Sequence, residues 1–249
     1  QSLHFKQLFD SIKFFEFNNL HHEHISYGTL NDSDGNPFKT RDGGTKPLGE
    51  LFDETYKYIK NINSDLEDST IKQLANSVLT FSDLITNRKT DYKFDLEKFT
   101  NVNGKTGIYV QYAQVRAKKL QQSISQQKNQ IESLVLSDVD KRLLSQLFMF
   151  GYFLDQSSLL NEPHHLANYL YDISNAFNQF YEHEKISEIK DINHLSSKHY
   201  LINLFLTTSE NVMFCLGMKP VEKMWLQKYL SCDNPNNQYQ AVGIFIYDI

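Results

Sequence analysis

Along most of this chain, apolar residues recur among polar ones with the period of an amphipathic helix. Apolar side chains recur every three or four positions, a spacing that places them on one face of a helix and leaves the polar residues on the other. This pattern predicts helices over residues 3–17, 48–62, 71–83, 108–124, 137–154, 163–180 and 197–216. A strict alternation over residues 24–30 predicts one short strand. The expected fold class is therefore mainly α.

Residues that favour helix ends support several of these boundaries. Ser137 precedes an apolar-periodic run and is a good N-cap, and Pro163 stands at the expected first position of its helix. Gly217 ends the last helix, with Pro220 just beyond. The first helix begins with no capping residue before it, which suggests that an earlier part of a larger protein is missing.

The spacing of these segments divides the chain. Residues 98–216 read as four long helices with short connections, which predicts a helical bundle. Residues 31–46 are rich in Gly, Asp, Asn and Pro and predict a loop, and residues 87–92 predict a polar turn. The chain shows no internal repeat.

Composition narrows the class of protein. The chain has 249 residues, of which 40% are apolar and 13% aromatic, enough for sizeable cores. No apolar run is long enough for a membrane span and no signal peptide is visible, so we expect a cytoplasmic protein without membrane contact. Cys215 and Cys232 form no metal-binding pair and no disulfide framework, which agrees with a reducing compartment.

The helix predicted from residue 108 carries the most distinctive surface. Tyr109, Tyr112 and Arg116 lie at i, i+3 and i+7, on one face, and residues 98–128 contain six basic side chains and no acidic one. Such a face suits unstacked bases and phosphates. The net charge of −5 limits any phosphate contact to local patches of this kind. On spacing alone, a packing helix with half-exposed tyrosines and a solvated basic edge is the favoured interpretation.

Two other stretches carry candidate chemistry. Lys39, Thr40 and Arg41 precede the Gly43-Gly44 pair, as in a mobile cationic loop that closes over phosphates, although a charged surface loop fits the same composition. The residues are not spaced as in a P-loop. The polar run at residues 21–24, His-His-Glu-His, matches no zinc-binding spacing, and no metal site is predicted in this chain.

Four segments, in order, resemble motifs of arginyl-tRNA synthetases, which are class I aminoacyl-tRNA synthetases. Residues 34–45, DGNPFKTRDGGT, resemble that family's KMSKS-type loop, and residues 90–95, TDYKFD, resemble its T-D-Y-x-F-D. Residues 109–116, YVQYAQVR, resemble its Y-x-Q-Y-A-x-x-R. The fourth segment, EPHHLANYLYD followed by FNQFY at residues 177–181, resembles the family's helical anticodon-binding domain.

The resemblance covers residues 1–224 and implies a domain division. Residues 1–47 would be the end of a Rossmann-type catalytic domain, a small α/β remnant with the KMSKS-like loop. Residues 48–97 would form a helical connection near the tRNA stem, residues 98–224 the anticodon-binding domain, and residues 225–249 a C-terminal extension.

The resemblance also implies roles for single residues. Lys39, Thr40 and Arg41 would stabilise the pyrophosphate that leaves ATP, with Mg²⁺, as arginyl-adenylate forms, and Gln1 would belong to the arginine pocket. The residues expected to contact the anticodon of the arginine tRNA by stacking and hydrogen bonds are Tyr109, Tyr112, Arg116, Phe177 and Tyr181.

The family's H-x-G-H signature, in the nucleotide-binding half, is not found in these residues. We therefore expect this chain alone not to charge tRNA, the other half being supplied by the same gene product or by another chain.

Three hypotheses for the function of the chain stay open. The chain is part of an arginine-tRNA ligase that uses arginine, ATP and tRNA, and not DNA; it is a non-catalytic tRNA-binding module derived from one; or it is a structural helical protein.

Overall fold

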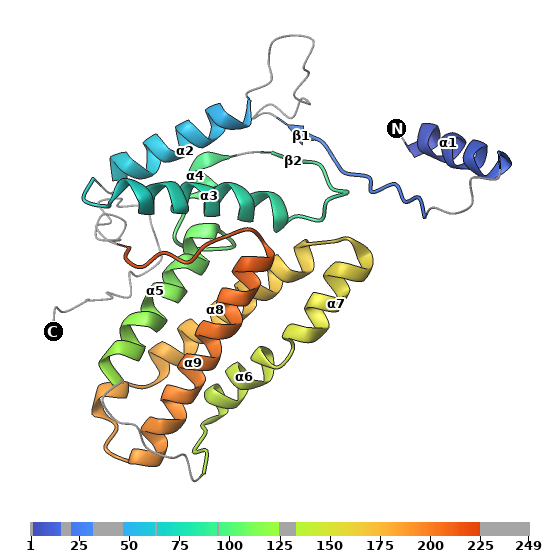
Figure 1. Ribbon diagram of the computed structural model, residues 1–249. Helices are drawn as coiled ribbons and strands as arrows, with labels where there is room; N and C mark the ends of the chain where they lie inside the picture. The colour runs from blue at the N-terminus through green and yellow to red at the C-terminus, as the bar shows by residue number, and fades with distance from the viewer. Residues whose placement is uncertain are drawn as a thin grey trace, which may run out of the picture.

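The computed structural model describes residues 2–15, 21–31, 47–62, 64–93, 95–124 and 133–224, and these residues are largely helical (Figure 1). The mainly α fold class is confirmed. In chain order the elements are α1 (Ser2–Phe14), β1 (Leu30–Asn31), α2 (Leu48–Ile62), α3 (Asp68–Leu84), β2 (Tyr92–Lys93), α4 (Leu96–Phe99), α5 (Gly107–Ile124), α6 (Asp138–Leu147), α7 (Phe150–Leu160), α8 (His164–His183), the 3₁₀ turn η2 (Ile186–Glu188) and α9 (Ile192–Cys215).

A bundle of α5, α6, α8 and α9 forms the larger part of the described chain, with α7 packed on the side of α8 (Figure 1). Its interior holds most of the apolar stripes predicted from the sequence, but Phe148 and Leu154, expected on the apolar face of the 137–154 run, are exposed. The largest fully buried apolar side chains in this core are Phe81, Leu143, Tyr169, Leu170, Ile173, Phe177, Phe180, Leu201 and Phe205. Burial of these stripes is the main source of bundle stability.

A second, smaller core lies between α2, α3 and the first half of α5. Ile59, Leu74 and Val78 are buried there, and so are Val221 and Met224 from the segment that follows α9. This segment, residues 218–224, is called the C-terminal strap below. It connects the two cores, because its Met218 packs into the bundle.

The side chain of Gln111 on α5 holds the C-terminal strap in place. Its Nε2 donates to the carbonyl of Lys219 at 2.8 Å and to Ser77 Oγ at 2.8 Å, and its Oε1 accepts from the backbone N–H of Val221 at 3.0 Å. Gln111 is fully buried, so these bonds satisfy polar groups that water does not reach.

The two short strands form a parallel pair, with Leu30 opposite Tyr92 and Asn31 opposite Lys93. Gly28 allows the two backbone segments to lie close together, because a Cβ there would lie 2.6 Å from the carbonyl oxygen of Thr90. Asp91 Oδ1 accepts hydrogen bonds from the backbone N–H of Thr29 at 2.6 Å and from its hydroxyl at 2.7 Å. The polar turn predicted at 87–92 includes Tyr92, which is the first residue of β2. Of the strand predicted at 24–30, only Leu30 is in a strand.

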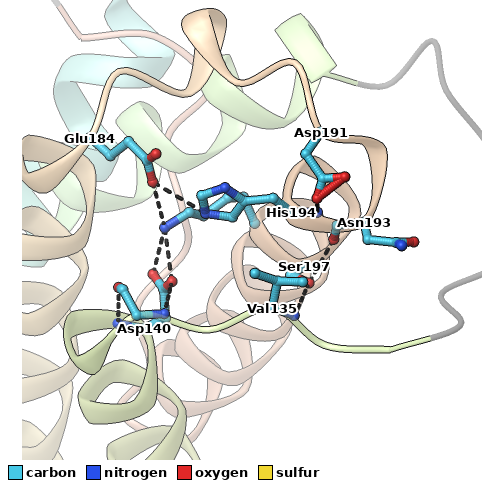
Figure 2. Close-up of polar contacts among 9 residues, drawn as sticks. Val135, Asp140, Glu184, Asp191, Asn193, His194 and Ser197 are labelled. Atoms are coloured by element: carbon cyan, nitrogen blue, oxygen red, sulfur yellow. Dashed lines mark hydrogen bonds and ion pairs between the residues drawn. The ribbon is translucent and has the colours of Figure 1, made fainter.

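An ion cluster lies at the end of the bundle where α8 leads into α9, away from the strands in Figure 1, and Figure 2 shows its side chains. Lys198 Nζ lies 2.8 Å from both carboxylate oxygens of Asp140 and 3.1 Å from Glu184 Oε2. His194 Nε2 lies 3.3 Å from the same Glu184 oxygen. The side chains of Lys198 and Asp140 are each only 1% exposed. Asp140 also completes a capping box with Ser137, the predicted N-cap, so the cluster joins α6, α8 and α9.

Two helix predictions need correction. The run expected as one helix over residues 137–154 is broken at Phe148–Met149 into α6 and α7, although both residues are apolar and neither is proline or glycine. The helix expected from residue 197 begins at Ile192, because the side chain of Asp191 caps it by accepting from the backbone N–H of His194. Residues 98–216 therefore hold five helices of ten or more residues instead of four. The last helix, α9, ends just before Gly217, which has φ 72°, as predicted.

Two further features concern the cysteines and the apolar character of the helices. Cys215 has a free, exposed thiol, and Cys232 lies outside the described residues. Within the described ranges, no helix combines the length and apolar character needed to cross a membrane.

Candidate functional site

The N-terminal end of α5 is fixed by a very close contact with α3. Gly107 is its first residue, and a Cβ at that position would lie 2.2 Å from the carbonyl oxygen of Ser77. Val110, Ala113 and Ala117 then face the bundle core, as predicted. This orientation turns Tyr109 and Arg116 toward α8, while Tyr112 packs against the smaller core and lies beside Arg116.

The guanidinium of Arg116 lies between two tyrosine rings. Its Cζ is 4.4 Å from the ring centroid of Tyr112 on the same helix and 4.6 Å from that of Tyr181 on α8. The Arg116 side chain is only 7% exposed. Both rings are half-buried, and each uses one face for the cation. The predicted residues Tyr112, Arg116 and Tyr181 are thus brought together.

The polar contacts of Arg116 are incomplete. Nη1 donates to Asn178 Oδ1 at 3.0 Å and lies 3.5 Å from Glu182 Oε1, whose side chain is 56% exposed. Nη2 is buried and has no hydrogen-bond partner. A guanidinium carries five donors, and a buried donor without a partner is energetically costly.

Tyr109 sits one turn earlier on the same face. Its ring packs against Tyr171 at 5.3 Å between centroids, and its hydroxyl donates to Asn175 Oδ1 at 3.3 Å. Burial raises the pKa of Tyr109 and of Tyr112 above the usual value, and for both the positive charge of Arg116 acts in the opposite direction. The two phenols therefore stay neutral donors at neutral pH.

Taken together, these side chains form a site suited to planar, polar ligands. It has π faces from tyrosines, one fixed positive charge, one unpaired donor and an exposed carboxylate beside it. We call Tyr109, Tyr112, Arg116, Asn178, Tyr181 and Glu182 the α5–α8 site.

Phe177 does not belong to this surface. Its side chain is fully buried and stacks on Phe205, with centroids 4.2 Å apart and an interplanar angle of 13°. It continues the buried stripe of α8 through Leu170 and Ile173, so it supports the site from inside the bundle. The expectation that Phe177 lines a binding groove does not agree with this burial.

Sequence reasoning missed Asn178 and Glu182. Both lie in or next to the FNQFY motif, and Asn178 shares a helix face with Tyr181 at i+3 and with Glu182 at i+4. Helical spacing alone would have replaced Phe177 by Asn178, because residue 177 is in phase with the apolar stripe and residue 178 is not.

The basic residues of segment 98–128 do not form one patch. Lys105 Nζ donates to Asn168 Oδ1 at 2.8 Å and lies over the ring of Tyr171. Lys118, which leaves α5 on another side, pairs with Glu222 at 2.9 Å. Lys128 lies outside the described residues. Arg116 lies over both Tyr112 and Tyr181.

The remaining predicted site residues cannot be placed. Gln1, Lys39, Thr40 and Arg41 lie outside the described residues, as does the predicted extension at 225–249. The His-Glu-His segment at 21–24 is described. There the ring of His24 stacks on Phe5 at 4.4 Å and that of His22 lies 5.7 Å from Phe9, so both pack against α1.

Two family models match the chain on either side of the start of α5. Residues 1–96 match the catalytic domain of class I tRNA synthetases (R), and residues 110–224 match the DALR anticodon binding domain. The chain belongs to the arginyl-tRNA synthetase family. The resemblance read from the four motifs is thereby confirmed, and the chain corresponds to the C-terminal part of the family's members.

Curated relatives agree. The arginine-tRNA ligase of Francisella tularensis subsp. novicida is 37% identical over 202 residues, which are 77% of this chain and 35% of the relative. That of Stutzerimonas stutzeri is 32% identical over 236 residues, 90% of this chain and 41% of the relative. The chain thus spans less than half the length of these arginyl-tRNA synthetases.

Solved structures share the fold. The Thermus thermophilus arginyl-tRNA synthetase superposes with a TM-score of 0.72 at 20% identity, covering 81% of this chain and 35% of that one. The Plasmodium falciparum arginyl-tRNA synthetase gives 0.66 at 24% identity, covering 89% and 39%. The arrangement of the bundle and the α2–α3 pair is therefore that of the arginyl-tRNA synthetase fold.

Proposed function

We propose that this chain is part of an arginine-tRNA ligase, which attaches arginine to its tRNA through arginyl-adenylate, and that it supplies anticodon recognition and the KMSKS-like loop. The α5–α8 site would receive the anticodon. The observation that carries this assignment is Arg116, held between Tyr112 and Tyr181 with a buried, unpaired Nη2. Bases offer ring faces for the tyrosines and edge acceptors for that donor.

The catalytic contribution would come from the loop. Lys39, Thr40 and Arg41 would stabilise pyrophosphate as it leaves ATP, with Mg²⁺ as counter-ion, and Gln1 would contact the arginine substrate. The domain division at residues 47, 97 and 224 belongs to the same proposal. So do a cytoplasmic location, the absence of DNA among the partners, and a nucleotide-binding half in the same gene product or in another chain.

Equilibrium binding to tRNA tests the anticodon assignment. The chain is titrated, at a fixed and stated salt concentration, with an arginine tRNA and with the same tRNA carrying a replaced anticodon. We expect about tenfold or greater discrimination, equivalent to about 1.4 kcal/mol, and its loss in Tyr112→Ala and Arg116→Lys.

Matched controls are available on the bundle surface. Tyr152→Ala removes a 54% exposed tyrosine from α7, and Arg142→Ala removes an exposed arginine from α6. Both should keep the discrimination. Equal binding of the two tRNAs by the folded wild-type chain would contradict the anticodon assignment and would favour the structural hypothesis.

The KMSKS-like loop distinguishes the proposed ligase fragment from the alternative, a non-catalytic tRNA-binding module. In an enzyme reconstituted with a nucleotide-binding half, Lys39→Ala with Arg41→Ala should sharply reduce adenylate formation and leave tRNA binding nearly intact. Unchanged adenylate formation, or equal losses in both measurements, would contradict this division of roles.

A further inference from the structure

The turn between α7 and α8 brings together three potential metal ligands. Asn161 ends α7 in the left-handed conformation, φ 51°, and its neighbour Glu162 is anchored by a hydrogen bond from its backbone N–H to the carbonyl of Ser157 at 3.0 Å. Helix α8 then begins with His164 and His165. The sequence analysis gave this Glu-Pro-His-His run only a packing and family role.

The side chains of Glu162, His164 and His165 converge. One ligand atom from each lies within 4.8 Å of the other two, and the two imidazole centroids are 4.1 Å apart. His165 Nε2 lies 3.4 Å from Glu162 Oε2. Adjacent residues on a helix normally point about 100° apart, so this convergence depends on the rotamers chosen at the first turn.

One ring nitrogen of each histidine in this cluster is buried without a hydrogen bond. His164 Nδ1 and His165 Nε2 are shielded from solvent, and neither makes a hydrogen bond. Buried polar nitrogens are nearly always paired, so two such atoms beside one carboxylate indicate a missing ligand.

We propose that Glu162, His164 and His165 bind a Zn²⁺ ion. Two imidazole nitrogens and one carboxylate oxygen are a usual donor set for zinc with one open position, which water would fill. Ligand atoms around tetrahedral zinc are roughly 3.3 Å apart, given bonds of about 2.0 Å, so ligand atoms now up to 4.8 Å apart have to approach by up to about 1.5 Å.

Nearby positive charge sets the strength of this site. Lys89 Nζ lies 3.1 Å from Glu162 Oε1, and the Lys89 side chain is 58% exposed, so it can move into solvent when the ion enters. Arg88 stays in place, because its Nε donates to the carbonyl of Asn161 at 2.9 Å and its Nη1 donates to the carbonyl of Ser26. Lys89 is therefore a competitor of the metal for Glu162, and removing its charge should strengthen zinc binding.

Zinc binding to the full chain, prepared without a histidine tag, tests the proposal. Zn²⁺ affinity is measured by competition with a chromogenic chelator, and Co²⁺ is added as a spectroscopic probe of imidazole ligation. We expect one ion per chain and a loss of about tenfold or more in affinity for His164→Ala and for His165→Gln. Lys89→Met should bind at least as tightly as wild type.

Two controls make the result specific. Glu23, in the His-Glu-His segment, accepts from Asn161 Nδ2 at 3.3 Å, so that segment is close enough to be a rival site. The double variant His22→Ala with His24→Ala should bind zinc as wild type does, and so should His194→Ala. All variants are first checked by circular dichroism, and the two single-histidine variants serve as substitutes for each other if one does not fold.

Three results would overturn the zinc site: no zinc uptake by the folded wild-type chain, unchanged affinity in His164→Ala and His165→Gln, or weaker binding by Lys89→Met. None of them bears on the tRNA-binding proposal, because the α5–α8 site shares no residue with this cluster.

Discussion

At the scale of single residues, Arg116 illustrates how a buried cation is tolerated in this bundle. Its charge is compensated by two tyrosine π faces and the Asn178 carbonyl, while the nearest carboxylate, Glu182, is half-exposed. Burying an isolated charge without partners would be very unfavourable. A guanidinium suits this position better than an ammonium, because it is planar, stacks on rings and is more weakly hydrated.

Asp91 provides a pH-dependent contribution at the same scale. Hydrogen bonds from the backbone N–H and the hydroxyl of Thr29 hold the pKa of Asp91 below its usual value. In that case the unfolded chain binds more protons than the folded chain as the pH falls below about 4, so this contribution is present above about pH 4 and is lost as the pH falls through the lowered pKa.

Asp91→Asn should therefore be less stable than wild type at pH 5, and the difference in unfolding free energy should shrink toward pH 3. Urea unfolding of both proteins across this range measures it. A difference that stays constant with pH would show that the charge of Asp91 does not contribute.

The residue scale also shows where sequence reasoning stopped. Tyr109, Tyr112 and Arg116 follow from helical spacing, since all three lie on one helix. Asn178 and Glu182 come from α8, and nothing in the spacing of α5 says which face of another helix it meets. Phe177 was selected from a motif, although its phase with Ile173 and Leu170 already assigns it to the core.

At the scale of elements, the contact between α3 and α5 depends on one glycine. Gly107→Ala would place a methyl group 2.2 Å from a backbone oxygen of α3, so the helices have to separate. We expect a loss of about 1 to 3 kcal/mol in unfolding free energy.

Gly151→Ala is the matched control for this substitution. Gly151 lies in α7 with nothing within 4 Å of its added Cβ, so alanine should stabilise the protein by about 0.5 to 1 kcal/mol. Chemical denaturation of both variants gives the comparison. Equal effects of the two substitutions would contradict the close contact at Gly107.

The ion cluster that joins α6, α8 and α9 makes a second element-scale prediction. Lys198→Met removes the cation from two carboxylates and leaves Asp140 buried without a counter-ion, so we expect a loss of about 3 to 5 kcal/mol in unfolding free energy. Lys185→Met, in a surface pair with Glu188 at 3.2 Å, should cost less than about 1 kcal/mol. Thermal and urea unfolding measure both, and similar losses would contradict a structural role for the cluster.

Sequence patterns predicted most elements because helical amphipathicity is local. They failed where the cause is tertiary. The break at Phe148–Met149 contains no glycine or proline, Gly151 lying just inside α7, and it lets Phe150 and Phe153 pack on Tyr169 of α8. The pairing of β1 with β2 was missed for the same reason, since the strands are two residues each and lie about sixty residues apart.

At the scale of the whole molecule, the C-terminal strap unites the two cores. Gln111→Ala would orphan the backbone groups of Lys219 and Val221, at roughly 1 to 3 kcal/mol for each group. We expect lower stability together with faster hydrogen exchange in residues 218–224. Gln122→Ala, an exposed change on the same helix, is the control, and indistinguishable exchange in the two variants would contradict the role of Gln111.

The position of the strap in the chain has a consequence for how the protein is made. The ribosome synthesises the chain from its N-terminus, so α2, α3 and α5 emerge well before Val221 and Met224. Until then the smaller core lacks two of its buried side chains, and the amide of Gln111 lacks its strap partners. Completion of this core therefore waits for the synthesis of residue 224, and a nascent chain stalled before that point would expose apolar surface to chaperones.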